Sequence, residues 1–196
     1  MRKLLLVLFV LLVFFLDCQA YPSAEDIIKK VKDVYDKTKS FRGVAEFYVI
    51  SGNDTTGREV QFVVSKPDKF RVEDDKFIMA SNGEMIWVYD KNNKTIIYKE
   101  KYNGYRPDVD YGQFIDNLQN SDLKLVGTES FNGVECYVIS AYLKDLKIKV
   151  MVYIDKNRFV PVKFETKLKD VTSVMVYKQI KMNVTINSSI FEPPEQ

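Results

Sequence analysis

The side chains that could perform catalysis are few in this 196-residue chain. It contains no histidine, so neither a Ser–His or Cys–His pair nor a histidine-containing metal site can be built. Of its two cysteines, Cys136 lies in the strand-like run Val134–Ile139, where a small buried hydrophobic residue is expected rather than a nucleophile. The residue types thus favour a protein without nucleophilic catalysis.

Carboxylates are plentiful, but their contexts do not indicate catalysis either. Asp74–Asp75 and Asp108–Asp110 lie in turn contexts, which favour Asp because its side chain bonds to the nearby backbone. The sequence has neither a glycine-rich phosphate loop nor an Asp-x-Asp-x-Asp-Gly calcium loop. We therefore expect a protein that is not an enzyme, with no metal site and no cofactor.

The composition indicates a chain that can bury a substantial hydrophobic core and that carries no strong electrostatic field. Hydrophobic residues make up 46% and aromatic residues 13%, which suffices for one buried core. Charged residues make up 29%, yet the net charge is only +2 and the lysines are spread along the chain. Nucleic-acid binding normally needs a clustered basic surface, so we expect no nucleic-acid partner.

Residues 1–20 have the pattern of an export signal. Arg2 and Lys3 precede the apolar run Leu4–Leu16, which is shorter than the roughly 20 residues that span a bilayer. Cys18-Gln19-Ala20 then supplies small residues at the spacing of a signal-peptidase site. Cleavage after Ala20, retention as an anchor and acylation of Cys18 are the alternatives, and Asp17 is unfavourable for the last. Residues 21–196 are expected to form a single exported domain, monomeric in solution.

Four Asn-x-Ser/Thr triplets could carry glycans in an exported protein, at Asn53, Asn93, Asn183 and Asn187. Such triplets also arise by chance in a chain rich in Asn. Asn53 and Asn93 lie in predicted turns, so they are the better candidates for glycosylation.

Two amphipathic helices are predicted. The first begins after Ser23, a good N-cap, and ends near Ser40. Its apolar residues share one face by their spacing, and they are Ile27, Ile28, Val31, Val34 and Tyr35. The second has the spacing i, i+3, i+4, i+7 at Tyr111, Phe114, Ile115 and Leu118. A helix this short is not stable alone, so each must lie on an apolar surface.

The rest of the chain predicts about eleven short antiparallel strands. Period-two alternation is bounded by turn residues such as Pro67-Asp68, Asn82-Gly83 and Asn132-Gly133. The predicted strands are 44–50, 60–65, 70–73, 77–80, 85–89, 95–99, 123–129, 134–142, 146–154, 159–166 and 171–182. The fold class is thus α+β, mainly β, with the helices capping a curved sheet or barrel.

Several stretches together resemble the LolA-like family of outer-membrane lipoprotein-sorting proteins. The similarity lies in Lys66–Val72, Ser81–Glu84 and Trp87–Asp90, then Tyr111–Asp116, Val126-Gly127 with Phe131–Ile139, Val152–Asp155 with Phe159–Glu165, and Asn183–Pro194. It spans about residues 25–194. No single motif is decisive, but their order and spacing are specific together. The resemblance implies a strongly curved antiparallel sheet, an incomplete barrel, whose concave face holds acyl chains beneath a helical lid.

The resemblance also implies site residues. Arg71 stands where the family has an Arg that holds the lid closed; the alternative is an exposed pair with Glu73 or Asp74. Helix and strand periodicity place the candidate cavity lining at Ile27, Ile28, Val31, Val34, Tyr35, Phe47, Val60, Phe62, Val64, Phe77, Met85, Trp87 and Tyr89. The second helix, with Tyr111, Phe114, Ile115 and Leu118, completes the lid.

Two functions remain open from sequence alone. The first is an exported carrier that binds lipid or lipoprotein acyl or isoprenoid chains, with a membrane-anchored donor or acceptor protein as a further partner. The second is a surface interaction or sensor module with a filled core that binds a protein along an edge strand. An apolar stripe serves both, because sequence reports which side chains are apolar but not whether they enclose empty volume.

Overall fold

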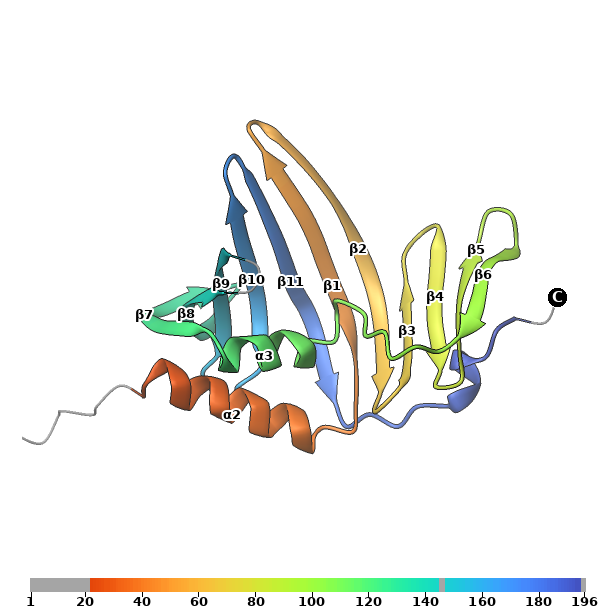
Figure 1. The fold of residues 1–196 in the computed structure, drawn as a ribbon, viewed down its shortest axis with the longest axis horizontal. Coiled ribbons are helices and arrows are strands. Elements are labelled where there is room, and N and C mark those ends of the chain that lie inside the picture. Colours follow the sequence, from red (N-terminus) through yellow and green to blue (C-terminus); the bar gives the residue numbers. More distant parts are fainter. Residues whose placement is uncertain (1–21, 145–146, 195–196) are drawn as a thin grey trace, which may run out of the picture.

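The computed structural model describes residues 22–144 and 147–194, and the expected signal segment lies outside them. In this part of the chain, eleven strands form one antiparallel sheet in the linear order β6-β5-β4-β3-β2-β1-β11-β10-β9-β8-β7. The sheet is open and strongly curved, and two helices lie across its concave side (Figure 1). The predicted fold class is confirmed.

The strands follow the predicted order with different lengths. Their bounds are β1 Ser40–Ser51, β2 Asp54–Ser65, β3 Lys69–Glu73, β4 Phe77–Asn82, β5 Met85–Asp90, β6 Thr95–Lys101, β7 Asp122–Phe131, β8 Val134–Leu143, β9 Ile148–Asp155, β10 Pro161–Leu168 and β11 Val171–Met182. A short 3-10 helix, η1, covers Ser188–Phe191. β2 is longer than predicted because its outer half extends beyond the helices, where its residues are exposed and the apolar alternation fades. β1 instead gains residues mainly at its inner end, 40–43, where Ser40 and Phe41 are buried.

Helix α2 (Ala24–Lys37) begins where the sequence predicted. The Ser23 hydroxyl accepts a hydrogen bond from the Asp26 N–H at 3.0 Å, and the acids of the first turn face the positive end of the helix dipole. The helix ends at Lys37, three residues before the predicted end, and the hydroxyl of the C-cap residue Thr38 donates to the Val34 carbonyl. Its apolar face is buried almost completely against the sheet and α3.

The topology forces one connection to cross the concave face. β6 and β7 are consecutive strands, yet they lie at opposite edges of the sheet. The chain between them therefore runs from one edge to the other, first as the irregular segment 102–111 and then as α3 (Gly112–Gln119) (Figure 1). We call residues 102–111 the crossing segment. None of the helices in the described part of the chain is long and apolar enough to span a bilayer.

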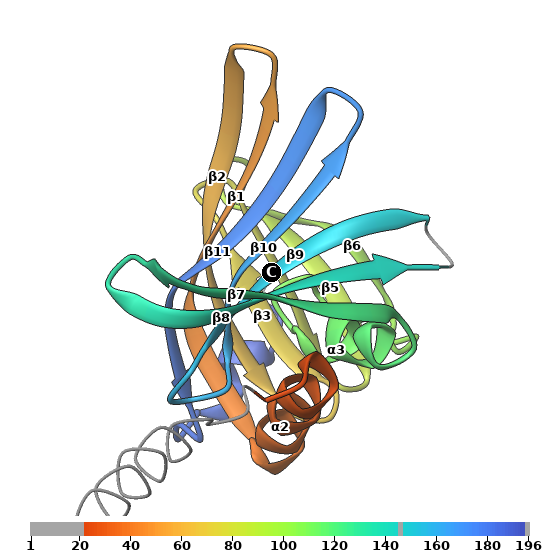
Figure 2. The ribbon, with the colours of Figure 1, turned by 90° about the vertical axis from the view of Figure 1, so that its left-hand side faces the viewer.

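The main core lies between the helices and the lower concave face (Figure 2). An aromatic cluster fills its centre, with ring centroids 5.2 to 6.3 Å apart, and consists of Tyr35, Phe41, Phe62, Tyr111 and Tyr177. Such tilted and edge-on pairs add to the energy of burial. The hairpins β1–β2 and β10–β11 extend past this core and past both helices (Figures 1 and 2).

Candidate functional site: an apolar cavity beneath the crossing segment

A cavity of about 320 Å³ lies beneath the crossing segment, which is the low end of the range usual for ligand pockets. Its walls come from the six neighbouring strands β1 to β6 and from the crossing segment. They consist of Phe47, Arg58, Val60, Val72, Asp74, Phe77, Met79, Val88, Ile97, Tyr105, Pro107, Asp108 and Val109. The lining is mainly apolar, and its charged members are one arginine and two aspartates.

A second, more open groove of about 520 Å³ continues from this cavity along the long hairpins. Phe47 and Arg58 line both spaces. Beyond them the groove is lined by residues of β1, β2, β10 and β11, including Val49, Phe164 and Met175. The concave face thus presents an apolar track that begins beneath the crossing segment and ends between the two hairpins.

Arg58 lies at the junction of the two spaces. Its guanidinium carbon is 5.7 Å from the centre of the Phe47 ring, and its Nη1 is 3.7 Å from Asp74 Oδ2. The Arg58 side chain is 64% exposed, so water screens this ion pair and the side chain can move at little cost. The junction therefore places a mobile cation between two apolar walls, with the Asp74 carboxylate beside it.

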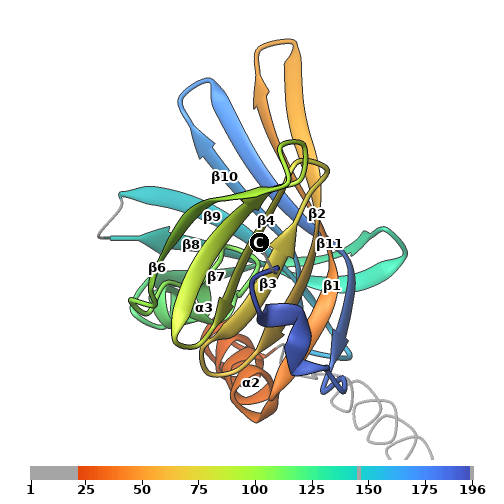
Figure 3. The same ribbon diagram turned by 90° about the vertical axis from the view of Figure 1, so that its right-hand side faces the viewer.

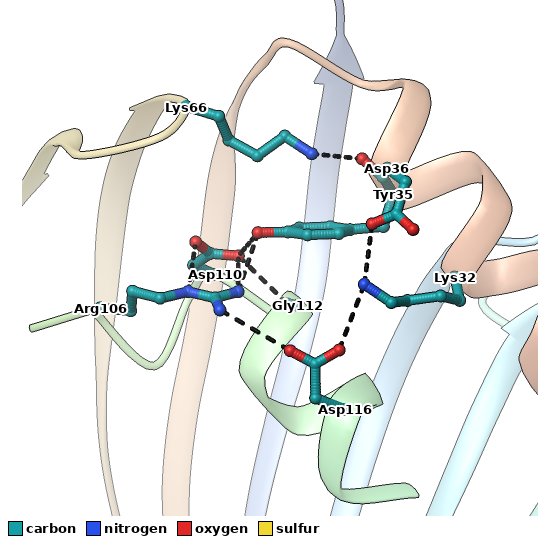
Figure 4. A network of polar contacts seen from close by, with 8 residues as sticks. All are labelled: Lys32, Tyr35, Asp36, Lys66, Arg106, Asp110, Gly112 and Asp116. Carbon is teal, nitrogen blue, oxygen red and sulfur yellow. Dashed lines mark hydrogen bonds and ion pairs between the residues drawn. The ribbon is translucent and has the colours of Figure 1, made fainter. Parts of the chain in front are cut away.

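The crossing segment is fixed to α2 by polar contacts that we call the α2 network: Lys32, Tyr35, Arg106, Asp110 and Asp116 (Figure 4). The Tyr35 hydroxyl donates to Asp110 Oδ1 at 2.8 Å and accepts from Arg106 Nη2 at 2.8 Å. Lys32 Nζ lies 3.2 Å from Asp116 on α3. Burial, with the neighbouring Asp110 carboxylate, raises the pKa of the Tyr35 hydroxyl far above its ordinary value, so it remains a donor.

Gly112 leaves room for this network. A Cβ at Gly112 would lie 2.1 Å from Tyr35 Cζ and 2.3 Å from Arg106 Nη2, so only glycine permits the close approach of α3 to the Tyr35 ring (Figure 4). The Gly112 N–H donates to Asp110 Oδ1 at 3.1 Å, so Asp110 accepts from one backbone donor at the start of α3. Lys66, from the turn after β2, donates to the Tyr35 carbonyl, and burial lowers the pKa of its amine.

The structure places the candidate lining residues in three different environments. Phe47, Val60 and Phe77 line the cavity. Seven others lie in or against the packed core rather than at a cavity wall, namely Ile27, Ile28, Val31, Val34, Tyr35, Phe62 and Val64. The second helix residues Tyr111, Phe114, Ile115 and Leu118 also pack into this core. The cavity is therefore beside the helices and not beneath α2, because the aromatic cluster fills the space there.

Met85, Trp87 and Tyr89 face away from the cavity, and their predicted place in its lining is wrong. Val88 of the same strand lines the cavity, so alternation directs its neighbours to the convex face. There Trp87 packs with Ile78 and Ala80 in a separate small cluster, and Tyr89 packs against that cluster. The Trp87 indole N–H donates to the Phe191 carbonyl at 3.1 Å, which fixes the C-terminal segment (183–194) to this face (Figure 3).

Arg71 also points to the convex face, so the predicted contact with the lid is wrong. Its guanidinium donates to Glu73 Oε2 at 2.7 and 3.0 Å and to the Ile190 carbonyl at 3.2 Å. Burial of Glu73 raises the pKa of its carboxyl, but hydrogen bonds from Lys91 and Arg71 outweigh this effect and lower it. Arg71 therefore fixes the C-terminal segment, whereas the arginine that contacts α2 is Arg106.

No pattern in the sequence indicated the α2 network or the role of the crossing segment. Arg106, Asp108 and Asp110 lie in an irregular stretch with neither a helical nor a strand period. The glycosylation candidates Asn53 and Asn93 do lie in exposed turns. The Asn93 side-chain amide donates to Asp90 Oδ2 at 2.8 Å.

Comparison with solved structures identifies the fold. No protein-family model matches the sequence. LprF from Mycobacterium bovis is similar in structure with a TM-score of 0.55 and 11% identity, covering 84% of this chain and 95% of that one. The MucA/MucB complex of Pseudomonas aeruginosa gives a TM-score of 0.51 and 13% identity, over 87% of this chain and 61% of that one. The chain has the LolA-like fold that its sequence resemblance implied.

One relative is similar along nearly the whole sequence. An uncharacterized protein of Methanocaldococcus jannaschii is 30% identical over 203 residues, which covers 99% of this chain. The chain spans 59% of the length of that relative.

Proposed function

We propose that this protein is an exported carrier that binds a lipid, or the acyl or isoprenoid chain of a lipoprotein, and transfers it at the cell envelope. The observation that supports it is the continuous apolar track from the cavity to the groove between the hairpins. Burial of a chain is favourable by about 0.8 kcal/mol per CH₂, so affinity would come chiefly from chain length. A membrane-anchored protein would act as donor or acceptor.

The dimensions of the track fit a flexible chain better than a compact ligand. The cavity alone is small for a long lipid, at about 320 Å³. The strands continue from Phe47 to Ser51 over four residues of β1, which adds roughly 13 Å of groove at about 3.3 Å per residue. Met79 and Met175 border the two spaces, and flexible methionine side chains suit a pocket that changes shape.

Native mass spectrometry of the protein purified without detergent tests the proposal. We expect a bound mass that disappears on organic extraction, and uptake of a fluorescent fatty acid by the extracted protein. A clean protein mass together with no uptake of the probe would refute the carrier function. The identity of the bound mass would define the substrate class.

A second candidate function is a surface interaction module on the same fold. The observation that favours it is the complete packing of the α2 face, where Ile27, Ile28 and Val31 are at most 1% exposed. The edge strands β6 and β7 also present exposed apolar residues, Ile97 at 55% and Val126 at 56%. A protein could add a strand at either edge. Loss of partner capture on mutation of Val126, with no lipid bound, would favour this function over the carrier.

A further inference from the structure

The tips of two hairpins form one surface at the open end of the groove. β1 and β11 are neighbours, and their register pairs Ser51 at the end of β1 with Val171 at the start of β11. Val171 also pairs with Leu168 across the β10–β11 turn. Both hairpins extend beyond the helices and past the crossing segment, so the two tips lie together away from the packed core (Figures 1 and 2).

Three apolar side chains are exposed on the concave side of these tips: Val49 at 41%, Leu168 at 53% and Val171 at 36%. Phe164 faces the core, and alternation along β10 directs Leu168 to the same concave side. Val49 follows Phe47 by two residues, so it also faces the groove. Scattered exposed hydrophobic residues are normal, but three on adjoining strands at the mouth of an apolar groove mark an interaction surface.

Exposed lysines accompany this apolar edge. Lys167 precedes Leu168 and Lys169 follows it in the turn, and Lys149 lies on the adjoining strand, one residue before Val150, which pairs with Thr166. Alternation directs Lys149 and Lys167 to the convex side of the sheet, so their charges lie behind the apolar edge. These three lysines form no ion pair with another described residue. Asp54 and Asp170 are the acidic residues of the two turns, so the positive charge lies mainly on the β10–β11 side.

We propose that these tips dock on an anionic lipid bilayer. We define the tip surface as Val49, Leu168 and Val171 with Lys149, Lys167 and Lys169. The apolar side chains would enter the interface while the lysines lie near the lipid phosphates, an arrangement that buries apolar area and pairs charge in one contact. The docked orientation places the groove mouth at the membrane, so the proposal extends the carrier function by naming the surface through which a chain enters.

Fluorescence of an indole placed in the tip tests the orientation. Leu168→Trp puts the probe in the tip surface, and Val126→Trp puts a matched probe of similar exposure on the edge strand β7. The native Trp87 is fully buried on the convex face, and wild-type protein gives its background signal. Vesicles of phosphatidylglycerol with brominated acyl chains are added to the full chain. We expect strong quenching of the indole at position 168 and none at position 126.

Charge is tested in the same assay. We expect Lys167→Gln with Lys169→Gln, in the Leu168→Trp chain, to weaken vesicle binding about thirtyfold. Each lysine near an anionic surface strengthens binding about fivefold, and the two effects multiply. Phosphatidylcholine vesicles should quench much less. Equal quenching at positions 126 and 168 would mean that another segment carries the chain to the vesicle, and absence of quenching at 168 would mean no docking. Either result overturns the proposal.

A second copy of the chain is the other possible occupant of the tips. A blue shift of the indole at position 168 that grows with protein concentration, without vesicles, would show self-association and overturn membrane docking. The assay does not involve the cavity. Docking without uptake of a fatty-acid probe would refute the carrier function and support membrane docking through the tip surface. Uptake without docking would support the carrier function and refute membrane docking.

Discussion

Tyr35 and Asp110, which are 75 residues apart in the chain, are joined by a hydrogen bond of 2.8 Å at the centre of the packed core. Asp110 is only 5% exposed, so its charge depends on this donor, on Arg106 and on the N–H of Gly112. The contact fixes the crossing segment against α2. The position of the cavity roof therefore depends on a polar contact within an otherwise apolar region.

We predict that Tyr35→Phe destabilises the protein by about 2 kcal/mol, because a buried carboxylate loses its donor and Arg106 loses an acceptor. Tyr111→Phe is the matched control. The Tyr111 ring lies 5.2 Å from that of Tyr35 and is fully buried, but its hydroxyl has no hydrogen-bond partner among the described residues. Its removal should be neutral or stabilising by up to about 1 kcal/mol. Urea unfolding measures both, and equal losses would contradict the assigned roles.

Acid should destabilise the protein partly through Asp155. Burial raises the pKa of its carboxyl, but hydrogen bonds from the Arg158 side chain and from the backbone of Arg158 and Asn157 outweigh burial and lower it. A lowered folded-state pKa contributes stability that is fully present above the unfolded value of about 3.9 and is lost as the pH falls through the folded value.

Asp155→Asn keeps the acceptor for the turn and removes the charge. We expect a loss of about 1 kcal/mol at pH 7, a modest value because Arg158 is nearly half exposed and water screens the pair. The stabilities of variant and wild type should converge as the pH falls below the folded pKa of Asp155. Asp170→Asn, in the exposed β10–β11 turn, serves as control. A difference that persists at low pH would show that Asp155 acts by packing and not by charge.

Arg71→Leu separates the sequence-based prediction from the structure. A lid contact at Arg71 would make the variant retain bound lipid or fail to release it. Because Arg71 instead contacts Glu73 and the Ile190 carbonyl, we expect wild-type release of a fatty-acid probe and faster proteolysis within the C-terminal segment. Arg42→Leu, an exposed arginine of β1, is the control. Altered lipid release with normal proteolysis would restore the lid role of Arg71.

Arg71 and Trp87 show which features of the site could be predicted from the sequence. Alternation correctly assigned residues to a shared face of a strand, and turn residues correctly separated the eleven strands. Nothing in the period of a single strand says which of its faces is concave, so β5 was assigned with its apolar residues toward the cavity. The 3-10 helix at Ser188–Phe191 covers the convex face there, and this long-range packing decided the outcome.

The cavity itself could not be predicted for a related reason. Phe47, Val60 and Phe77 line the cavity. Phe62 and Val64, which share the concave face of β2 with Val60, belong instead to the filled core. The difference arises where the aromatic cluster ends and the crossing segment begins, and that segment has no regular period. Empty volume is a property of packing between distant segments, and Tyr105, Pro107 and Val109 could be assigned to its roof only from the fold.

Filling the cavity should block lipid binding without unfolding the protein. Val88 is half buried on the concave face of β5 and lines the cavity, so Val88→Trp places a large side chain where space exists and should cost little stability. We expect the affinity for a fluorescent fatty acid to fall at least about tenfold, which corresponds to about 1.4 kcal/mol. Val126→Trp, which adds the same side chain on the exposed edge strand β7, should bind the probe as wild type does.

Probe titration and urea unfolding are measured on both variants. A stable Val88→Trp protein with wild-type affinity would show that the chain does not bind beneath the crossing segment, and the open groove between the hairpins would remain as its binding site.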